Sequence, residues 1–389
     1  MEALKADPEV TETAALFFQA RKTGDWQFIF MKAVKKLLSE IHCDFAGAPM
    51  SLLMILSILL CFAILISEPG FCGPTSGSAA SASASAAPAS AASASASASA
   101  SAFPLKVHCS FFPVFSMAEA IAGPHASLSP MFSPDQDPSE SIPSRDCIRE
   151  CQNSSDLILL NGAGFEKWME KVTLPMEKIV ETAAEMEDTF IFIKEEVNHS
   201  HGAAGLHSHQ GLDGHTWLSP IMAIKQADAI FQAFTDLRPH LTEKFKTGFN
   251  TLKSDLMTLD QAFRKGLKDF RGTLVASHPA YNYWAREYGV NLLSFTLDPN
   301  EIPEASALEH MKSKLNEITP PPRFMLWESQ PAPEVMKVIT DNLGLRHILF
   351  SPCEAIAPQN SKSPNSSFVE KMHQNLERLF HSLEISVKQ

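Results

Sequence analysis

The chain has 389 residues, enough for two domains of ordinary size, and 45% of them are hydrophobic, so it can build substantial cores. Its 44 acidic residues outnumber its 32 lysines and arginines and give a net charge of -12. Because phosphate binding needs a basic surface, this balance argues against nucleic acid as a partner.

Three segments precede the first predicted domain. Residues 1–50 are either a cytoplasmic extension or lie upstream of a true translation start near Met50. Residues 51–72 include the uncharged run SLLMILSILLCFAILI, which is short for a bilayer span but typical of a signal peptide. Residues 73–102 are rich in Ser and Ala and predict a flexible linker. We therefore expect an exported protein whose hydrophobic segment is cleaved or is kept as a membrane anchor.

The predicted N-terminal α/β lobe covers residues 103–220. The apolar run from Leu105 to Phe115 predicts a strand, the SMAEAIAG that follows suits a helix, and Asp156 to Gly162 predicts a second strand. GFEKWMEKV predicts another helix, and Thr189 to Val197 a further strand. Strand, helix and strand in succession predict a parallel sheet.

Residues 221–270 are predicted to be linking helices. After Pro239 an apolar stripe recurs at steps of three and four, typical of one long amphipathic helix. A coiled coil is the alternative. Residues 271–389 repeat the alternation as a C-terminal α/β lobe, so we expect two lobes with mostly parallel sheets joined by a long helix. The stripe consists of Phe245, Phe249, Leu252, Leu256, Leu259, Phe263 and Leu267.

A cluster of histidines fills the loop 199–215, where Gly, Ser and Asp favour irregular structure. Imidazole is the commonest protein ligand for borderline divalent metals, and a flexible loop lets several rings approach one ion. The alternative is a solvated loop in which the rings never meet. The histidines are His199, His201, His207, His209 and His215.

Polar residues also end the predicted strands of the second lobe. Ligands of open α/β sheets bind at the carboxyl ends of strands, and His278, Glu328 and Ser351 stand at such ends. A cleft between the lobes would bring them to His215. The alternatives are that His278 caps a helix or packs, and that Glu328 is a buried carboxylate at a helix start.

The seven cysteines lack CxxC pairs and the density of a disulfide scaffold. Cys147 and Cys151 lie four apart, which puts them on one face of a helix. They form no zinc-finger or redox motif, and cysteines at that spacing are more often packed thiols than metal ligands.

Several motifs in order resemble one family. They are FFPVF, the pair Asp137-Pro138, DLILLNGAGFEKW, the His-rich loop running into HTWLSP, SHPAYNYWAREYG and the strand ending in Glu328. From Leu105 to the C-terminus the chain resembles the cluster A-I solute-binding proteins of metal ABC importers. The resemblance implies a monomer in the periplasm or on the cell surface, a metal cleft between two lobes, and delivery of the ion to permease and ATPase subunits.

Members of that family hold the ion with four side chains. Carried over by position, the second ligand falls on His215 and the third on His278, whereas the first and fourth fall on Ser139 and Ser351. Neutral hydroxyls are poor zinc ligands, so two donors must be replaced. The expected replacements are Glu328, Cys353, His207 and His209, with Glu140 a further candidate.

The resemblance and the imidazoles predict a receptor that carries Zn²⁺, with Mn²⁺ as the alternative metal. A tethered scaffold of the same fold that has lost tight metal binding is the alternative function. A metalloenzyme with Glu328 as general base is disfavoured because the chain has no HExxH motif. We expect binding and release of the ion without bond chemistry.

Overall fold

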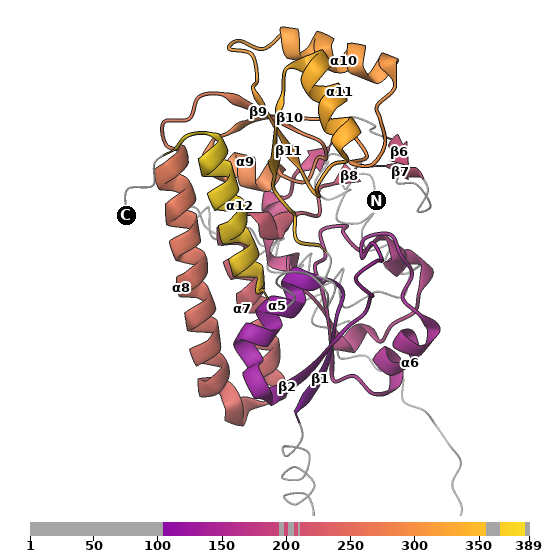
Figure 1. Ribbon diagram of the computed structural model, residues 1–389. Coiled ribbons are helices and arrows are strands. Elements are labelled where there is room, and N and C mark those ends of the chain that lie inside the picture. The colour runs from indigo at the N-terminus through magenta and orange to yellow at the C-terminus, as the bar shows by residue number, and fades with distance from the viewer. Residues whose placement is uncertain (1–103, 194–197, 201–205, 209–210, 355–365, 386–389) are drawn as a thin grey trace, which may run out of the picture. The chain divides into compact units, whose positions relative to one another are not determined.

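Two four-stranded parallel sheets organise the computed structural model, which describes residues 104–193, 198–200, 206–208, 211–354 and 366–385. The N-terminal sheet has the strand order β2-β1-β3-β4 and the C-terminal sheet the order β10-β9-β11-β12, with all neighbours parallel. Each sheet is the centre of one α/β lobe, drawn in purple to magenta and in orange in Figure 1. The predicted fold class is confirmed. The strands of the two sheets are β1 (Leu105–Cys109), β2 (Ala126–Pro130), β3 (Leu157–Leu160), β4 (Ile179–Glu181), β9 (Thr273–Ala276), β10 (Asn291–Ser294), β11 (Phe324–Trp327) and β12 (Arg346–Leu349).

Helices connect the strands and cover the sheets. The prediction of a strand as far as Phe115 is wrong, because α5 already begins at Phe112. Pro113 occupies the first turn of that helix, where a missing N–H group leaves no intrahelical hydrogen bond unmade. The helices are α5 (Phe112–Ala122), α6 (Arg145–Asn153), α7 (Pro220–Leu237), α8 (Thr242–Leu267), α9 (Asn282–Tyr288), α10 (Ala305–Asn316), α11 (Pro333–Leu343) and α12 (Phe368–Ser382).

The segment between β3 and α7 contains less regular structure than its sequence predicts. The helix predicted from GFEKWMEKV is the short 3-10 helix η2 (Lys167–Lys171). The strand predicted from Thr189 is reduced to β5 (Phe192–Ile193), which pairs antiparallel with β8 (Gly211–Leu212), and its residues 194–197 lie outside the described residues. Within the His-rich loop, β6 (Asn198–Ser200) and β7 (Leu206–Ser208) form a second antiparallel pair.

The long amphipathic helix after Pro239 is α8, as predicted, and every residue of its apolar stripe is buried. Figure 1 shows α8 beside α7, with α12 returning along the same side of the molecule. The cap of α12 anchors this return, because the Phe368 backbone N–H donates to Ser116 Oγ of α5 at 2.9 Å.

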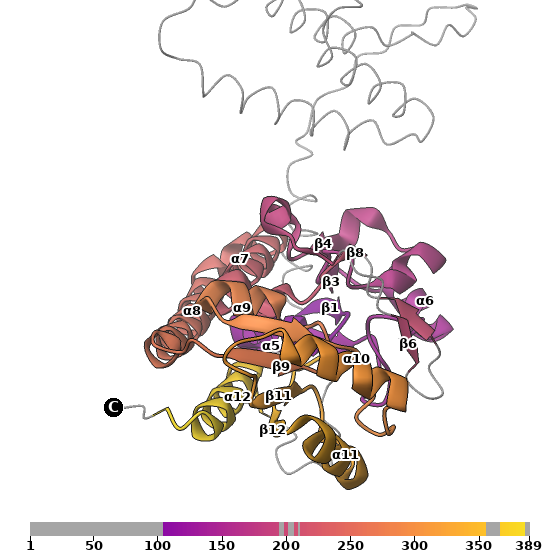
Figure 2. The same cartoon turned by 90° about the horizontal axis from the view of Figure 1, so that it is seen from above.

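One hydrophobic core joins both sheets to these helices. It contains Leu105 and Val107 of β1 together with Leu274 of β9 and Leu326 of β11, all packed with the stripe of α8. The view in Figure 2 shows α7, α8 and α12 on the same side of both sheets. The lobes are therefore parts of one packed body rather than two independent cores.

The opposite face of the N-terminal sheet has a smaller core. Ile158 and Leu160 of β3 pack there with Cys151 of α6 and Trp168 of η2. Because side chains alternate along a strand, His108 lies on this face while its neighbours Val107 and Cys109 belong to the large core.

The three segments predicted at residues 1–50, 51–72 and 73–102 lie outside the described residues. Among the helices that the structure does describe, none combines the length and the apolar character that crossing a bilayer requires.

Candidate metal centre

His215 reaches the site from a turn between β8 and the 3-10 helix η6 (Thr216–Leu218). Its ring is buried, and Asp213 Oδ1 accepts hydrogen bonds from both the His215 backbone N–H, at 3.0 Å, and Nδ1, at 2.7 Å. Asp213 is itself fixed by α9 of the other lobe, since Asn282 Nδ2 donates to Oδ2 and the Tyr283 hydroxyl donates to its carbonyl. Asp213 therefore sets the ring orientation and directs Nε2 away from itself.

His278 follows β9, at the carboxyl end of the C-terminal sheet, as its place in the sequence predicts. Its ring lies edge-on to that of His215, with 5.5 Å between the ring centroids. Glu328, which follows β11, places Oε2 3.6 Å from His278 Nδ1. Each histidine thus has a carboxylate beside its Nδ1 atom, the pattern that commonly orients histidine ligands of metals.

Glu354 contributes the third group, from the segment after β12. Its Oε1 atom lies 3.0 Å from His215 Nε2, and its side chain is 23% exposed. Cys353, the residue before it, has a φ of 65° in the left-handed region, so the chain turns there and redirects the next side chain.

The backbone of this turn is held on three sides. Asn375 of α12 bonds both the N–H and the carbonyl of Ser351, Trp217 Nε1 donates to the Pro352 carbonyl at 2.7 Å, and the Phe112 N–H donates to the Glu354 carbonyl at 3.1 Å. Donors from both lobes therefore fix the position of Glu354.

His215, His278 and Glu354 each offer one ligand atom, and these atoms all lie within 4.8 Å of one another. Two imidazoles and a carboxylate are the donor set of many zinc sites, in which a fourth position takes water or a substrate. The residues present therefore fit a divalent transition metal.

The contacts of His215 with Asp213 and Glu354 also affect its protonation. Burial disfavours a charged His215, but the hydrogen bonds to Asp213 and Glu354 outweigh burial and raise the pKa of His215 to about 10. Burial, followed by the charge of Glu354, raises the pKa of Glu328 to about 8. Asp137 and Asp298 add to that negative field at Glu328. The surroundings thus favour a cation next to these carboxylates.

The predicted donors fall into three groups. His215 and His278 are brought together, and Glu328 lies next to His278 without joining the three-atom group. The backbone of His207 lies in β7, whereas His209 lies outside the described residues.

Cys353, another predicted donor, is not in the group of three ligand atoms. Its side chain belongs to the large hydrophobic core, Sγ donates to the Ser351 carbonyl at 3.4 Å, and burial raises the pKa of the thiol to about 12. The thiol is therefore packed in the core.

The two serines and Glu140 have other roles. Ser139 donates its N–H and Oγ–H groups to Asp137 Oδ1, and Ser351 Oγ accepts from the Cys353 N–H. Glu140, the remaining candidate donor, forms an ion pair with Lys167.

Glu354 was missed because the fourth family ligand was placed by position on Ser351. The signal in the sequence was a carboxylate three residues further on, in SPCE. No pattern of residue types predicts the left-handed turn at Cys353 that brings this carboxylate back to the imidazoles.

Comparisons with known proteins point to one family. Residues 107–381 match the sequence model of the family described as "Zinc-uptake complex component A periplasmic". The chain is 26% identical over 284 residues to the zinc-binding lipoprotein AdcA of Streptococcus pneumoniae, covering 71% of this chain and 55% of the relative. It is 23% identical over 284 residues to the high-affinity zinc uptake system protein ZnuA of Bacillus subtilis, covering 72% and 88% respectively.

A solved structure of the Zn(II)-bound ZnuA-like domain of Streptococcus pneumoniae AdcA is similar with a TM-score of 0.60 and 22% identity, covering 72% of this chain and 98% of that one. The metal-dependent lipoprotein YcdH of Bacillus subtilis gives a TM-score of 0.59 at 20% identity, covering 71% and 97%. These likenesses show a common fold. The chain spans about half the length of the AdcA relatives that it matches.

Proposed function

The chain belongs to the family of periplasmic zinc-uptake components, and on that premise we propose that it captures one Zn²⁺ ion between its lobes and delivers it to an ABC importer. The observation that carries the proposal is the convergence of His215, His278 and Glu354 within 4.8 Å. The ion is cargo, so the chemistry consists of binding and release.

The donor set favours zinc over manganese. Imidazole suits Zn²⁺, whereas Mn²⁺ prefers carboxylate, carbonyl and water oxygens in a six-coordinate arrangement. Two imidazoles and one carboxylate complete three of the four positions of a tetrahedral zinc site. Water, or a histidine of the loop such as His207 or His209, would supply the fourth. Manganese remains the runner-up because Glu328 adds a second carboxylate beside the site.

Capture uses groups that the protein already holds in place. Asp213 orients His215 and Glu328 lies beside His278 Nδ1, so little ordering is required when the ion arrives. The arriving ion displaces the proton on His215 Nε2 that joins the ring to Glu354. Reprotonation of His215 supplies a route for release.

The proposal places the folded part outside the cytoplasm. Family membership and the hydrophobic segment 51–72 support export to the periplasm or the cell surface, with that segment as leader or membrane anchor. The partners are the permease and ATPase subunits of a metal importer, and the lobes act as a monomer. Binding of the ion, docking and release require no bond-breaking step on this chain.

Equilibrium dialysis of the metal-stripped full chain against Zn²⁺ and Mn²⁺ tests the proposal. We expect the tightest zinc site to disappear in the double variant His215→Ala, His278→Ala, while the His-rich loop retains weak binding. A chelator competitor separates these two classes of site.

The matched control is His310→Ala in α10, which removes an imidazole far along the chain from the candidate donors. Equal zinc affinity in the wild type and the double variant would contradict the receptor proposal and favour a scaffold of the same fold. Tighter binding of Mn²⁺ than of Zn²⁺ would identify Mn²⁺ as the cargo and leave the proposed site unchanged.

A further inference from the structure

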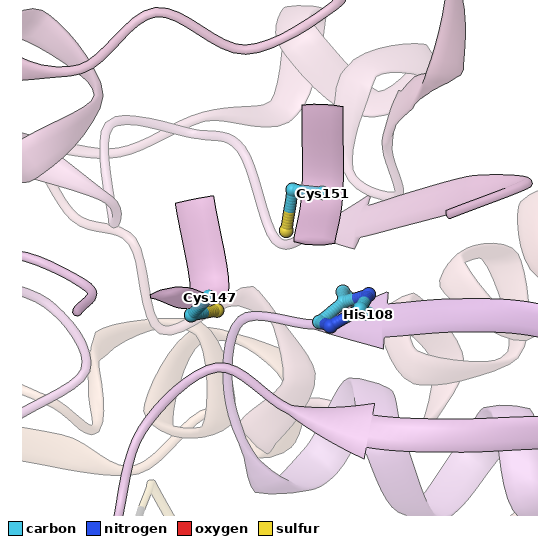
Figure 3. Close-up of side chains that lie close together, drawn as sticks. All are labelled: His108, Cys147 and Cys151. Atoms are coloured by element: carbon cyan, nitrogen blue, oxygen red, sulfur yellow. The ribbon is translucent and has the colours of Figure 1, made fainter. Parts of the chain in front are cut away.

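A second group of metal-ligand atoms lies in the N-terminal lobe, apart from the site described above. It consists of His108 at the end of β1 and Cys147 and Cys151 of α6, whose ligand atoms all lie within 4.8 Å of one another. Figure 3 shows the His108 ring and the two cysteine side chains close together between these elements. The group shares no residue with His215, His278 or Glu354.

Local structure explains why the three side chains meet. Cys147 and Cys151 are one helical turn apart on α6, and the Ser144 side chain caps that helix by accepting from the Cys147 N–H. His108 lies on the face of β1 that α6 covers. Sequence spacing reveals the two cysteines but not the strand residue opposite them.

Hydrogen bonding to Ser155 engages Nδ1 of His108 and leaves Nε2 as the candidate ligand atom. Nδ1 lies 2.6 Å from Ser155 Oγ, and Ser155 Oγ donates to the Glu150 carbonyl at 3.3 Å. When the Ser155 hydroxyl donates its proton to the carbonyl, Oγ can only accept from His108. Nδ1 then carries the proton and donates it to Oγ, and the ring lone pair lies on Nε2. In this tautomer Nε2 can ligate a metal.

We propose that His108 Nε2 and the sulfurs of Cys147 and Cys151 form a second metal site, selective for Zn²⁺ or another thiophilic ion. Zn–S bonds of about 2.3 Å and Zn–N bonds of about 2.0–2.1 Å separate tetrahedral ligand atoms by roughly 3.5–3.8 Å, so the observed group needs only a small contraction. Glu150 can complete the shell, because its Oε2 atom lies 3.5 Å from His108 Nε2.

The environment of the thiols supports a metal-binding role. Cys147 is half-buried and the Glu150 side chain is 66% exposed, so an ion has access from solvent, while Cys151 is fully buried. Both cysteines are unpaired thiols in this structure.

The consequence of an ion here differs from that of the cargo site. All four groups come from the N-terminal lobe, so the ion would fasten α6 to β1 without joining the two lobes. A site closed by three or four protein ligands has the character of a structural site, which contributes folding free energy directly.

Cobalt substitution tests the proposal, because thiolate ligands give Co²⁺ an intense sulfur-to-metal charge-transfer absorption that imidazole and carboxylate ligands do not. The reduced, metal-stripped full chain is titrated with Co²⁺ in the His215→Ala, His278→Ala background. We expect the charge-transfer band to saturate at one equivalent and to disappear on addition of Zn²⁺.

Variants assign the band to these residues. Cys147→Ser, at the half-buried position, and His108→Asn should each weaken or abolish the band, with unchanged far-ultraviolet circular dichroism to confirm the fold. Cys353→Ser is the matched control and should keep it. Absence of the band in the parent protein, or its persistence in the double variant Cys147→Ser, Cys151→Ser, would overturn the proposal.

Discussion

The side chain of Glu354 reaches the candidate metal centre because the residue before it, Cys353, turns the backbone. Cys353 adopts a φ of 65°, a conformation uncommon for residues other than glycine, and its thiol is buried while the next side chain turns back to His215. Local strain of this kind persists only where the surroundings enforce it. Here Asn375, Trp217 and the start of α5 hold the turn.

Replacing Glu354 by Gln tests its role directly. The amide keeps the size of the side chain but removes the negative charge and the preferred zinc donor, so we expect zinc affinity to fall by about 100-fold or more, since even supporting partners cost 10–100-fold. Chelator competition measures the change. The same substitution at the exposed Glu309 of α10 should leave affinity unaltered, and equal affinity in both variants would exclude Glu354 as a ligand.

The protonation of His215 predicts a pH dependence of binding. Burial opposes the charged ring, but Asp213 and Glu354 raise the pKa of His215 to about 10, so the metal-free ring is protonated at pH 7. Zinc must displace that proton, and affinity should therefore rise as the pH increases toward 10, by up to about tenfold per pH unit.

Calorimetry in buffers of different ionisation enthalpy counts the released protons. We expect an observed binding enthalpy that depends on the buffer, with release of about one proton at pH 7.5 from this ring. Asp213→Asn removes one of the two carboxylates and should reduce the release. A binding enthalpy independent of the buffer would contradict protonation of His215 in the metal-free protein.

At the scale of elements, α8 packs against α5 through a position where only glycine fits. A Cβ atom on Gly248 would lie 2.5 Å from the carbonyl oxygens of both Ala120 and Ile121. These are backbone atoms, so the helices themselves would have to separate. The close approach aligns α5, whose first turn supplies the N–H group that holds Glu354.

Gly248→Ala should lower the free energy of unfolding despite the better helix propensity of alanine. We expect a loss of about 1–3 kcal/mol, the usual cost of overpacking, measured by urea denaturation. Thr247→Ala, at the exposed neighbouring position of α8, is the control and should change stability by less than about 0.5 kcal/mol. A neutral Gly248→Ala would show that α5 and α8 can separate at little cost.

The elements that sequence reasoning identified are those with a strong period or a long buried run. The stripe of α8 and the buried β3 and β11 have such signals. The edge strands β2 and β4 escaped prediction, since no residue of either is fully buried and their apolar patterns are weak. His278 was found because it ends a recognisable strand, whereas Glu354 and His108 depend on a turn and on cross-element packing.

At the scale of the whole molecule, the two sheets share a core and are also joined by hydrogen bonds. Trp217 of the N-terminal lobe donates to the Pro352 carbonyl, and Tyr283 of the C-terminal lobe donates to the Asp213 carbonyl. Relative rotation of the lobes would disrupt this packing as well as these bonds. We therefore expect local adjustment on metal binding instead of a hinge motion.

Small-angle X-ray scattering of the metal-free and zinc-bound protein checks this expectation. The two curves should give the same radius of gyration within error, because the packed helices α7, α8 and α12 accompany both sheets. The His215→Ala, His278→Ala variant, measured with and without zinc, controls for effects of zinc on the His-rich loop. A clear contraction that requires intact His215 and His278 would show that the lobes close as separate bodies.

The continuous hydrophobic core also limits how such a protein can be recombined. The same helix, α8, packs with Leu105 of one sheet and Leu274 of the other. A lobe taken from a relative whose α8 differs would therefore not pack well against this chain's α8. Chimeras that exchange one lobe should thus misfold unless α8 matches the core residues of both sheets. The ligand set can vary more readily in the segments after the strands, where a carboxylate at a nearby position, such as Glu354, can replace one that is missing at Ser351.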